Sequence, residues 1–187
     1  VLLRLLKGRL KRAVKKVQQC DQVTELNELA ELETIEKTLS VFVWLTKQSE
    51  MGRVGIATAG GVEVVVKIMT TFPKCQMLQE RACDALRNLT WCSIGKAKAI
   101  GSGGIEVLLA AVTNHLDSAK LCEHACCAMS NIVKYNKENT ELLISLCGGA
   151  AVAKVRKEWR DNNDVQKQML ELANLIASEL HAWVHSH

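Results

Sequence analysis

The chain repeats itself with a period of 43 residues. When the sequence is shifted by that length, the pair Gly60-Gly61 falls on Gly103-Gly104. The apolar positions that follow also coincide: Leu78, Ala82, Cys83, Ala85, Leu86 and Leu89 fall on Leu121, Ala125, Cys126, Ala128, Met129 and Ile132. A repeat of this length indicates an array of similar units, none of which can bury its apolar face without its neighbours.

Each unit has the apolar spacing of α-helices, with residues recurring at i, i+3, i+4 and i+7. A short first helix is predicted before the glycine pair, a second helix after it, and a longer third helix after that. The predicted ranges are 95–101 and 138–146 for the first helix, 62–71, 105–113 and 150–159 for the second, and 76–91, 119–134 and 164–183 for the third. Helix-start residues precede the third helices at Pro73, Asp117-Ser118 and Asp161-Asn162-Asn163-Asp164.

The last unit keeps the period less well. Gly148-Gly149 begins it about two residues late, and a shift by the period places Asn174 on the asparagine of the preceding unit, Asn131. In that register Gln168 and Glu171 replace two alanines of the preceding unit. Polar residues at those positions predict a terminal cap whose outer face meets water.

A degenerate earlier unit is predicted at 21–59, with its third helix at 34–48. In the register chosen for it, Trp44 stands where later units have asparagine. The chain therefore divides into a segment at 1–20 and units at about 21–59, 60–102, 103–147 and 148–187.

Composition agrees with an all-α chain. There is one proline and only 4% of residues are aromatic, whereas 48% are hydrophobic, so the chain can form a core. No apolar run reaches the roughly 18 residues of a transmembrane helix. The sequence begins at Val1 rather than at methionine, so we expect it to be a processed or truncated piece.

The cysteines indicate a reducing environment. Most of the eight lie inside apolar helical patterns, where cysteine acts as a small buried hydrophobe. We therefore expect an intracellular location, in the cytoplasm first, with the nucleus or an organelle interior as alternatives.

The first 20 residues are basic and contain no acidic residue. Their apolar positions predict an amphipathic helix, whose basic face comprises Arg4, Lys7, Arg9, Lys11, Arg12, Lys15 and Lys16. Three functions are open for it: contact with an acidic partner or nucleic acid, contact with an anionic membrane surface, or a remnant of a targeting sequence. A structural alternative is a helix that caps the first repeat.

The units resemble armadillo repeats. The resemblance rests on the period, three helices per unit, the glycine pair before the second helix, and the phrase Leu86-Arg87-Asn88-Leu89, and it covers roughly 50–180. Related phrases occur at Met129-Ser130-Asn131-Ile132 and Leu172-Ala173-Asn174-Leu175. HEAT repeats are the nearest alternative, but they have two helices and usually lack the glycine pair. The resemblance implies a right-handed superhelix of three to four units with the third helices lining a concave groove.

The resemblance also implies a binding row. In armadillo proteins the asparagine of the third helix hydrogen-bonds the backbone of an extended partner segment, and the matching residues are Asn88, Asn131 and Asn174. An amide can satisfy a peptide unit because it donates and accepts at once. The importin-α branch carries tryptophan four residues before each asparagine. This chain has Asp84, Cys127 and Leu170 there, which counts against that kind of cargo.

A second row accompanies the asparagines. Arg81, His124 and Lys167 precede them by seven residues, and Trp91 and Lys134 follow two of them by three. Such a groove favours a segment carrying Asp, Glu or phosphate. The alternatives are structural: the asparagines satisfy a neighbouring unit's backbone, the basic side chains form a solvated face paired with Glu80 or Glu123, and Trp91 packs inside the array.

No catalytic constellation is present in the sequence. There is no G-x-S-x-G, no phosphate-cradling loop and no H-E-x-x-H. We expect no enzyme activity, no cofactor and no metal site. The leading expectation is a protein-interaction module that serves as an adaptor or as a subunit of a larger complex. The alternative is binding of nucleic acid or an anionic surface through the basic N-terminal helix.

Overall fold

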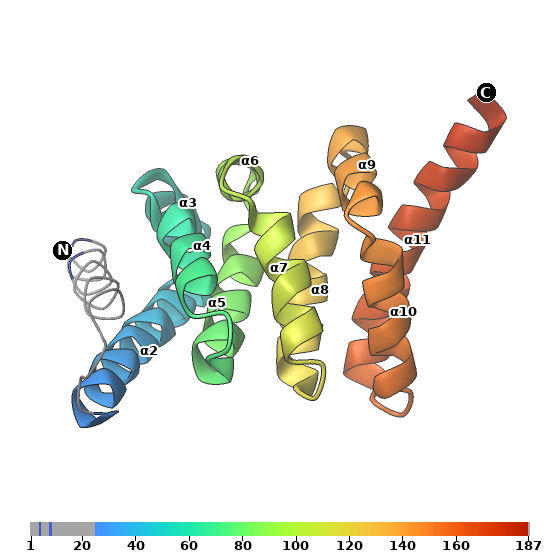
Figure 1. The fold of residues 1–187 in the computed structure, drawn as a ribbon. Coiled ribbons are helices and arrows are strands. Elements are labelled where there is room, and N and C mark those ends of the chain that lie inside the picture. The colour runs from blue at the N-terminus through green and yellow to red at the C-terminus, as the bar shows by residue number, and fades with distance from the viewer. Residues whose placement is uncertain (1–3, 5–7, 9–24, 187) are drawn as a thin grey trace.

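The computed structural model describes Arg4, Gly8 and residues 25–186, and within 25–186 the chain folds into ten α-helices and no strand. This all-α, solenoid-like array confirms the predicted fold class (Figure 1). Except for Arg4, which is exposed, the basic face predicted at 1–20 lies outside the described residues. The helices are α2 (Glu25–Gln48), α3 (Glu50–Thr58), α4 (Gly61–Thr71), α5 (Gln76–Leu89), α6 (Ser93–Gly101), α7 (Gly104–Asn114), α8 (Ala119–Val133), α9 (Lys137–Ser145), α10 (Gly148–Glu158) and α11 (Asn163–Ser186).

The helices form three successive three-helix units, preceded by α2. Figure 1 shows the second helices α4, α7 and α10 in one row, with the third helices α5, α8 and α11 behind them. The helix α5 packs against both α2 and α8, and α8 packs against α11. We call α2, α5, α8 and α11 the third-helix layer. Their inward residues, such as Leu39, Leu86 and Leu121, are fully buried and belong to one continuous core.

The two glycines of each pair have different roles. Gly60 and Gly103 adopt the left-handed conformation, with φ of 90° and 79°. The next residue must lack a side chain for another reason: a Cβ on Gly104 would come within 2.7 Å of the Ala99 carbonyl oxygen. In the last unit Cys147 takes the left-handed conformation instead, with φ of 62°. The third pair is therefore Cys147-Gly148, not the predicted Gly148-Gly149.

The last unit is displaced by 44 residues from the unit before it, not by 43. The buried residues of α11 are Val165, Met169, Leu172 and Ile176, which lie 44 residues after Leu121, Ala125, Ala128 and Ile132 of α8. The helix starts agree, because the side chains of Ser118 and Asn162 each accept a hydrogen bond from the N–H three residues later. The extra residue lies in the α8–α9 turn, where exposed Tyr135 has a φ of 64°.

This displacement corrects the expected terminal cap. Met169 and Leu172 occupy the buried alanine positions, whereas Gln168 is partly buried and Glu171 is exposed on the third-helix layer. Leu175, not Asn174, is the residue equivalent to the asparagine of the preceding unit.

Hydrogen bonds between neighbouring units follow the same register. The ring of His115, at the end of α7, bonds the Pro73 carbonyl at 2.8 Å, and Trp159, at the end of α10, donates to the Leu116 carbonyl at 2.8 Å. No single described helix is both long and apolar enough to cross a membrane; α3 and α4 reach that length only together and are bent by 70°.

Candidate partner-binding face

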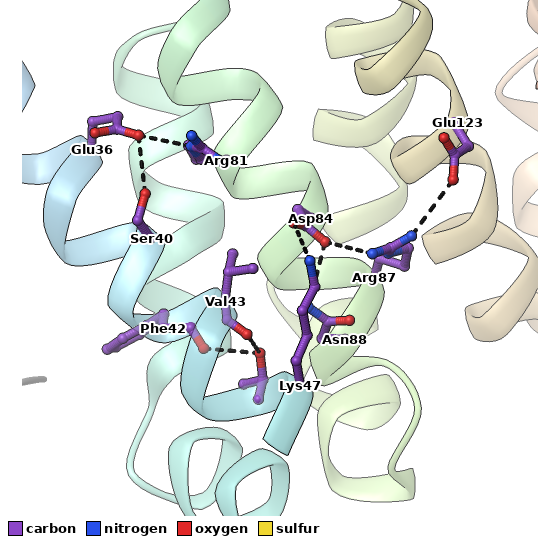
Figure 2. Close-up of polar contacts among 11 residues, drawn as sticks. Glu36, Ser40, Phe42, Val43, Lys47, Arg81, Asp84, Arg87, Asn88 and Glu123 are labelled. Atoms are coloured by element: carbon purple, nitrogen blue, oxygen red, sulfur yellow. Dashed lines mark hydrogen bonds and ion pairs between the residues drawn. The ribbon is translucent and has the colours of Figure 1, made fainter. Parts of the chain in front are cut away.

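Ion pairs join successive helices of the third-helix layer (Figure 2). The carboxylate of Asp84 on α5 accepts from Lys47 on α2 at 3.1 Å and from Arg87 at 2.8 Å. The other end of the Arg87 guanidinium lies 3.6 Å from Glu123 on α8. The Asp84 side chain is only 6% exposed, so its charge depends on these cations for compensation.

Two further pairs extend this arrangement across the layer. Arg81 on α5 donates to Glu36 on α2 at 2.7 Å, and Lys134 after α8 lies 3.3 Å from Glu171 on α11. Each cation thus has a carboxylate partner on a neighbouring helix. Ion pairs therefore link α2 to α5, α5 to α8, and the residue after α8 to α11.

The three predicted asparagines do not form one row. Asn88 is buried, and its side-chain amide donates to Asp84 at 3.4 Å. Asn131 donates to the Arg87 carbonyl at 3.2 Å and to the Thr90 hydroxyl at 3.3 Å, so it joins α8 to the end of α5. This is the structural alternative, in which asparagine satisfies a neighbouring unit's backbone. Asn174 is exposed and lies one position away from the equivalent of Asn131.

The predicted basic row is also divided. Arg81 pairs with Glu36 on α2, not with Glu80 or Glu123, which the solvated-face alternative named. Lys134, which follows Asn131 by three residues, pairs with Glu171. Lys167 is exposed and lies one position away from Gln168, the residue equivalent to His124. The predicted row of Arg81, His124 and Lys167 therefore does not present three free cations, because Arg81 is already paired with a carboxylate.

His124 is partly buried beside the Asp84 network. Burial lowers the pKa of its imidazole, with Asp84 opposing this effect and Arg87 adding to it. Its Nδ1 atom is buried and has no hydrogen-bond partner among the described residues. The neutral imidazole is therefore the form that fits the folded chain.

The buried imidazole predicts a pH effect on stability. Because the folded-state pKa lies below the ordinary value of 6.5, the unfolded chain binds the proton first as the pH falls. Stability contributed by His124 is thus lost as the pH drops through about 6.5 and levels off below the folded-state pKa. Urea unfolding at about pH 7.5 and about pH 5.5 should show a larger loss for the wild type than for His124→Gln. Equal losses would mean that His124 is solvated in the folded chain.

Three large aromatic side chains are exposed near the ends of successive third helices. Trp44 near the end of α2 is 61% exposed, Trp91 after α5 is 67% exposed, and Tyr135 after α8 is 92% exposed. The packing alternative for Trp91 is therefore wrong. The sequence analysis did not single out Tyr135. The one feature that could have pointed to it is the extra residue in the α8–α9 turn, which lengthens the repeat from 43 to 44 residues. The Lys134 ammonium lies 5.6 Å from the Tyr135 ring centroid, within cation–π range.

The cysteines behave as apolar side chains. The seven in the described part of the chain are free thiols, and Cys83 and Cys126 are fully buried. Burial raises the pKa of both thiols well above the ordinary value, and it raises the pKa of Cys122 to about 11. These thiols are packing residues rather than nucleophiles.

Comparison with known proteins supports the fold and names no activity. No family model and no curated protein matches the chain. The structure is similar to the crystal structure of an engineered protein, Northeast Structural Genomics Consortium target OR329, with a TM-score of 0.67 and 21% sequence identity. The match covers 91% of this chain and 63% of that one, so the chain spans less than two thirds of its length. At this identity the likeness shows the fold alone.

Proposed function

We propose that the chain is an armadillo-like, non-catalytic interaction module that holds a segment of a partner protein across its third-helix layer. The three-helix units support the armadillo assignment over HEAT repeats, as does the left-handed turn before each second helix at Gly60, Gly103 and Cys147. The free thiols, four of which are buried within the described part of the chain, support a reducing compartment, with the cytoplasm as the first choice. A module that binds another protein and catalyses no reaction would serve as an adaptor or as a subunit of a larger complex.

The observation that carries the proposal is the exposure of Trp44 on α2, of Trp91 in the turn after α5 and of Tyr135 in the turn after α8. Tryptophan and tyrosine dominate the binding energy of interfaces because they bury a large area with few rotatable bonds. These three side chains lie near the ends of α2, α5 and α8, which are successive neighbours in the array. The proposed segment runs along the array and contacts these three side chains in turn.

The geometry also indicates the chemistry of the partner. The cations that border the aromatic residues are held by carboxylates, as in the pairs Lys47–Asp84 and Lys134–Glu171. A partner therefore gains most from apolar side chains placed against the aromatic rings and from polar groups at the rim. Arg81 and Lys134 are already paired with carboxylates. They therefore give less support to a preference for acidic or phosphorylated segments than their sequence positions suggested.

Replacing both tryptophans tests this function. Trp44→Ala with Trp91→Ala should reduce capture of the partner from the native source at least tenfold, because single interface tryptophans often contribute about 2 kcal/mol. Thermal stability should change little, since both side chains are mostly exposed. The control is Lys67→Ala with Thr113→Ala, two exposed positions on the second-helix row. Unchanged capture by the tryptophan variant, or equal loss in the control, would contradict the proposal.

A further inference from the structure

A hollow of about 310 Å³ opens between α4 and α7 on the second-helix row. The helices α4 and α7 pack against each other, and each also packs against a further second or first helix, α3 beside α4 and α10 beside α7. The hollow is thus internal to the array and does not depend on either end of the chain. Its volume lies at the lower end of the range of about 300–1,000 Å³ that is typical of small-molecule sites.

The hollow exists because α7 has small side chains where the other second helices have a long one. Ala110 is equivalent to Lys67 in α4 and to Lys154 in α10, and it is followed by the small residue Ala111. Both alanines line the hollow. At this position α7 therefore has no long side chain to cover the space beside α4.

The wall of the hollow is mostly apolar. Met69 and Pro73 line it from α4 and the turn after it, and Val107, Ala110 and Ala111 line it from α7. Methionine sulfur packs favourably against aromatic rings, and its unbranched side chain adapts to their shape. An aromatic ring therefore suits this wall.

The charged residues near the hollow do not select a charged ligand. Glu106 lines the hollow, while Lys67 lies on α4 and Lys74 follows Pro73 in the turn. These three side chains are exposed or border solvent, and none has an ion-pair partner within the described part of the chain. Because both signs are present, the site favours a neutral molecule.

One buried polar side chain in the wall has an oxygen without a partner. Gln79 on α5 is 1% exposed, and its amide nitrogen donates to the carbonyls of Met69 at 3.0 Å and Phe72 at 2.9 Å. The equivalent Gln166 makes the corresponding two bonds in the last unit, so the nitrogen has a structural role. The Gln79 oxygen accepts no hydrogen bond from any residue that the structure describes. It is therefore a buried acceptor that a ligand can satisfy.

We propose that this hollow binds a free, neutral small molecule that has an aromatic ring about the size of indole and one N–H or O–H donor. The ring packs against the apolar wall, and the donor bonds to the side-chain oxygen of Gln79. The site lies on the second-helix row and is separate from the aromatic residues of the third-helix layer, so it goes beyond the proposed function.

Titration of the full chain with indole and with benzofuran tests the proposal, because benzofuran has the same shape but an oxygen in place of the N–H. In nuclear magnetic resonance spectra indole should shift the amide signals of residues 107–114. It should bind about fivefold more tightly than benzofuran, the difference expected of one hydrogen bond. Ala110→Lys should abolish binding, because it places a long side chain over the hollow. Ala153→Lys, at an exposed position of α10 outside the hollow, is the matched control and should bind as the wild type does.

Gln79→Cys isolates the hydrogen bond to the ligand. Cysteine is the residue that α8 has at the equivalent position, where the Cys122 thiol lies beside the carbonyls of His115 and Leu116, so the variant should fold. Circular dichroism checks this. The variant lacks the acceptor oxygen and should therefore bind indole and benzofuran equally.

Four outcomes would overturn the proposal. They are no binding of indole, equal binding of the two probes by the wild type, binding that survives Ala110→Lys, and an unchanged preference for indole in Gln79→Cys. Tighter binding of N-acetyltryptophan amide than of indole would also overturn it, because the occupant would then be a tryptophan of a partner protein. Trp44→Ala with Trp91→Ala should leave indole binding unchanged, so failure here and failure of the proposed function can be told apart.

Discussion

Gly95→Ala should destabilise the chain by about 3 kcal/mol, the upper end of the cost of overpacking a closely fitted site. Gly95 lies in the first turn of α6, where the helix passes directly over the end of α5. A Cβ at this position would overlap the carbonyl oxygen of Leu89, a backbone atom that cannot rotate away. The helix α6 would therefore have to move away from the end of α5. Thermal unfolding should show a fall in Tm of roughly 6–12 °C for a chain of this size.

Gly101→Ala is the matched control. It lies in the same helix, has open space around the position of its Cβ, and does not need a positive φ. Alanine is favoured over glycine in helices, so this variant should be neutral or more stable by up to about 1 kcal/mol. If both variants had the same stability, close packing of α6 on α5 would not hold the units together.

Asp84→Ala should cost about 2–3 kcal/mol, because it leaves the buried Asn88 without its acceptor and the half-buried Arg87 with only its longer contact to Glu123. The loss should exceed that of Glu33→Ala, which removes an exposed pair with Lys37 on α2 and should change stability by less than about 0.5 kcal/mol. Urea denaturation of both variants measures the difference.

A double-mutant cycle locates the Asp84 effect. If the carboxylate acts between helices, Lys47→Ala should cost much less in the Asp84→Ala background than in the wild type. Additive losses would show that Lys47 and Asp84 do not interact in solution. This ion pair would then not hold α2 against α5.

The helices were predictable because packing between units imposes the same apolar spacing on each of them. Leu78 and Leu121 take equivalent buried positions, and the third-helix starts at Ser118 and Asn162 lie where polar residues precede an apolar run. The register of the last unit was not predictable from glycine. Cys147 adopts the left-handed conformation that sequence rules assign to glycine. The turn before the second helix was therefore predicted at Gly148-Gly149, one residue later than its position in the structure.

The candidate site was less predictable because it depends on which side chains meet across units. From the sequence, an asparagine on a helix fits a partner-binding role and a structural role equally well. Only the placement of the α5 end beside α8 shows that Asn131 bonds the Arg87 carbonyl. The pairing of Asp84 with Lys47 spans two helices for the same reason. Exposure of Trp91 was undecidable from the pattern, because a tryptophan after a buried helix fits a core equally well.

Site-specific photo-crosslinking tests most directly whether the third-helix layer holds a partner. A photoreactive amino acid would replace Trp44, Trp91 or Tyr135 on that layer, and Lys67 or Thr113 on the second-helix row as controls. In extracts of the native source the three aromatic positions should crosslink to the same protein, through adjacent stretches of one segment, and the two controls should not. Crosslinks to a common protein only from the second-helix row would contradict the account.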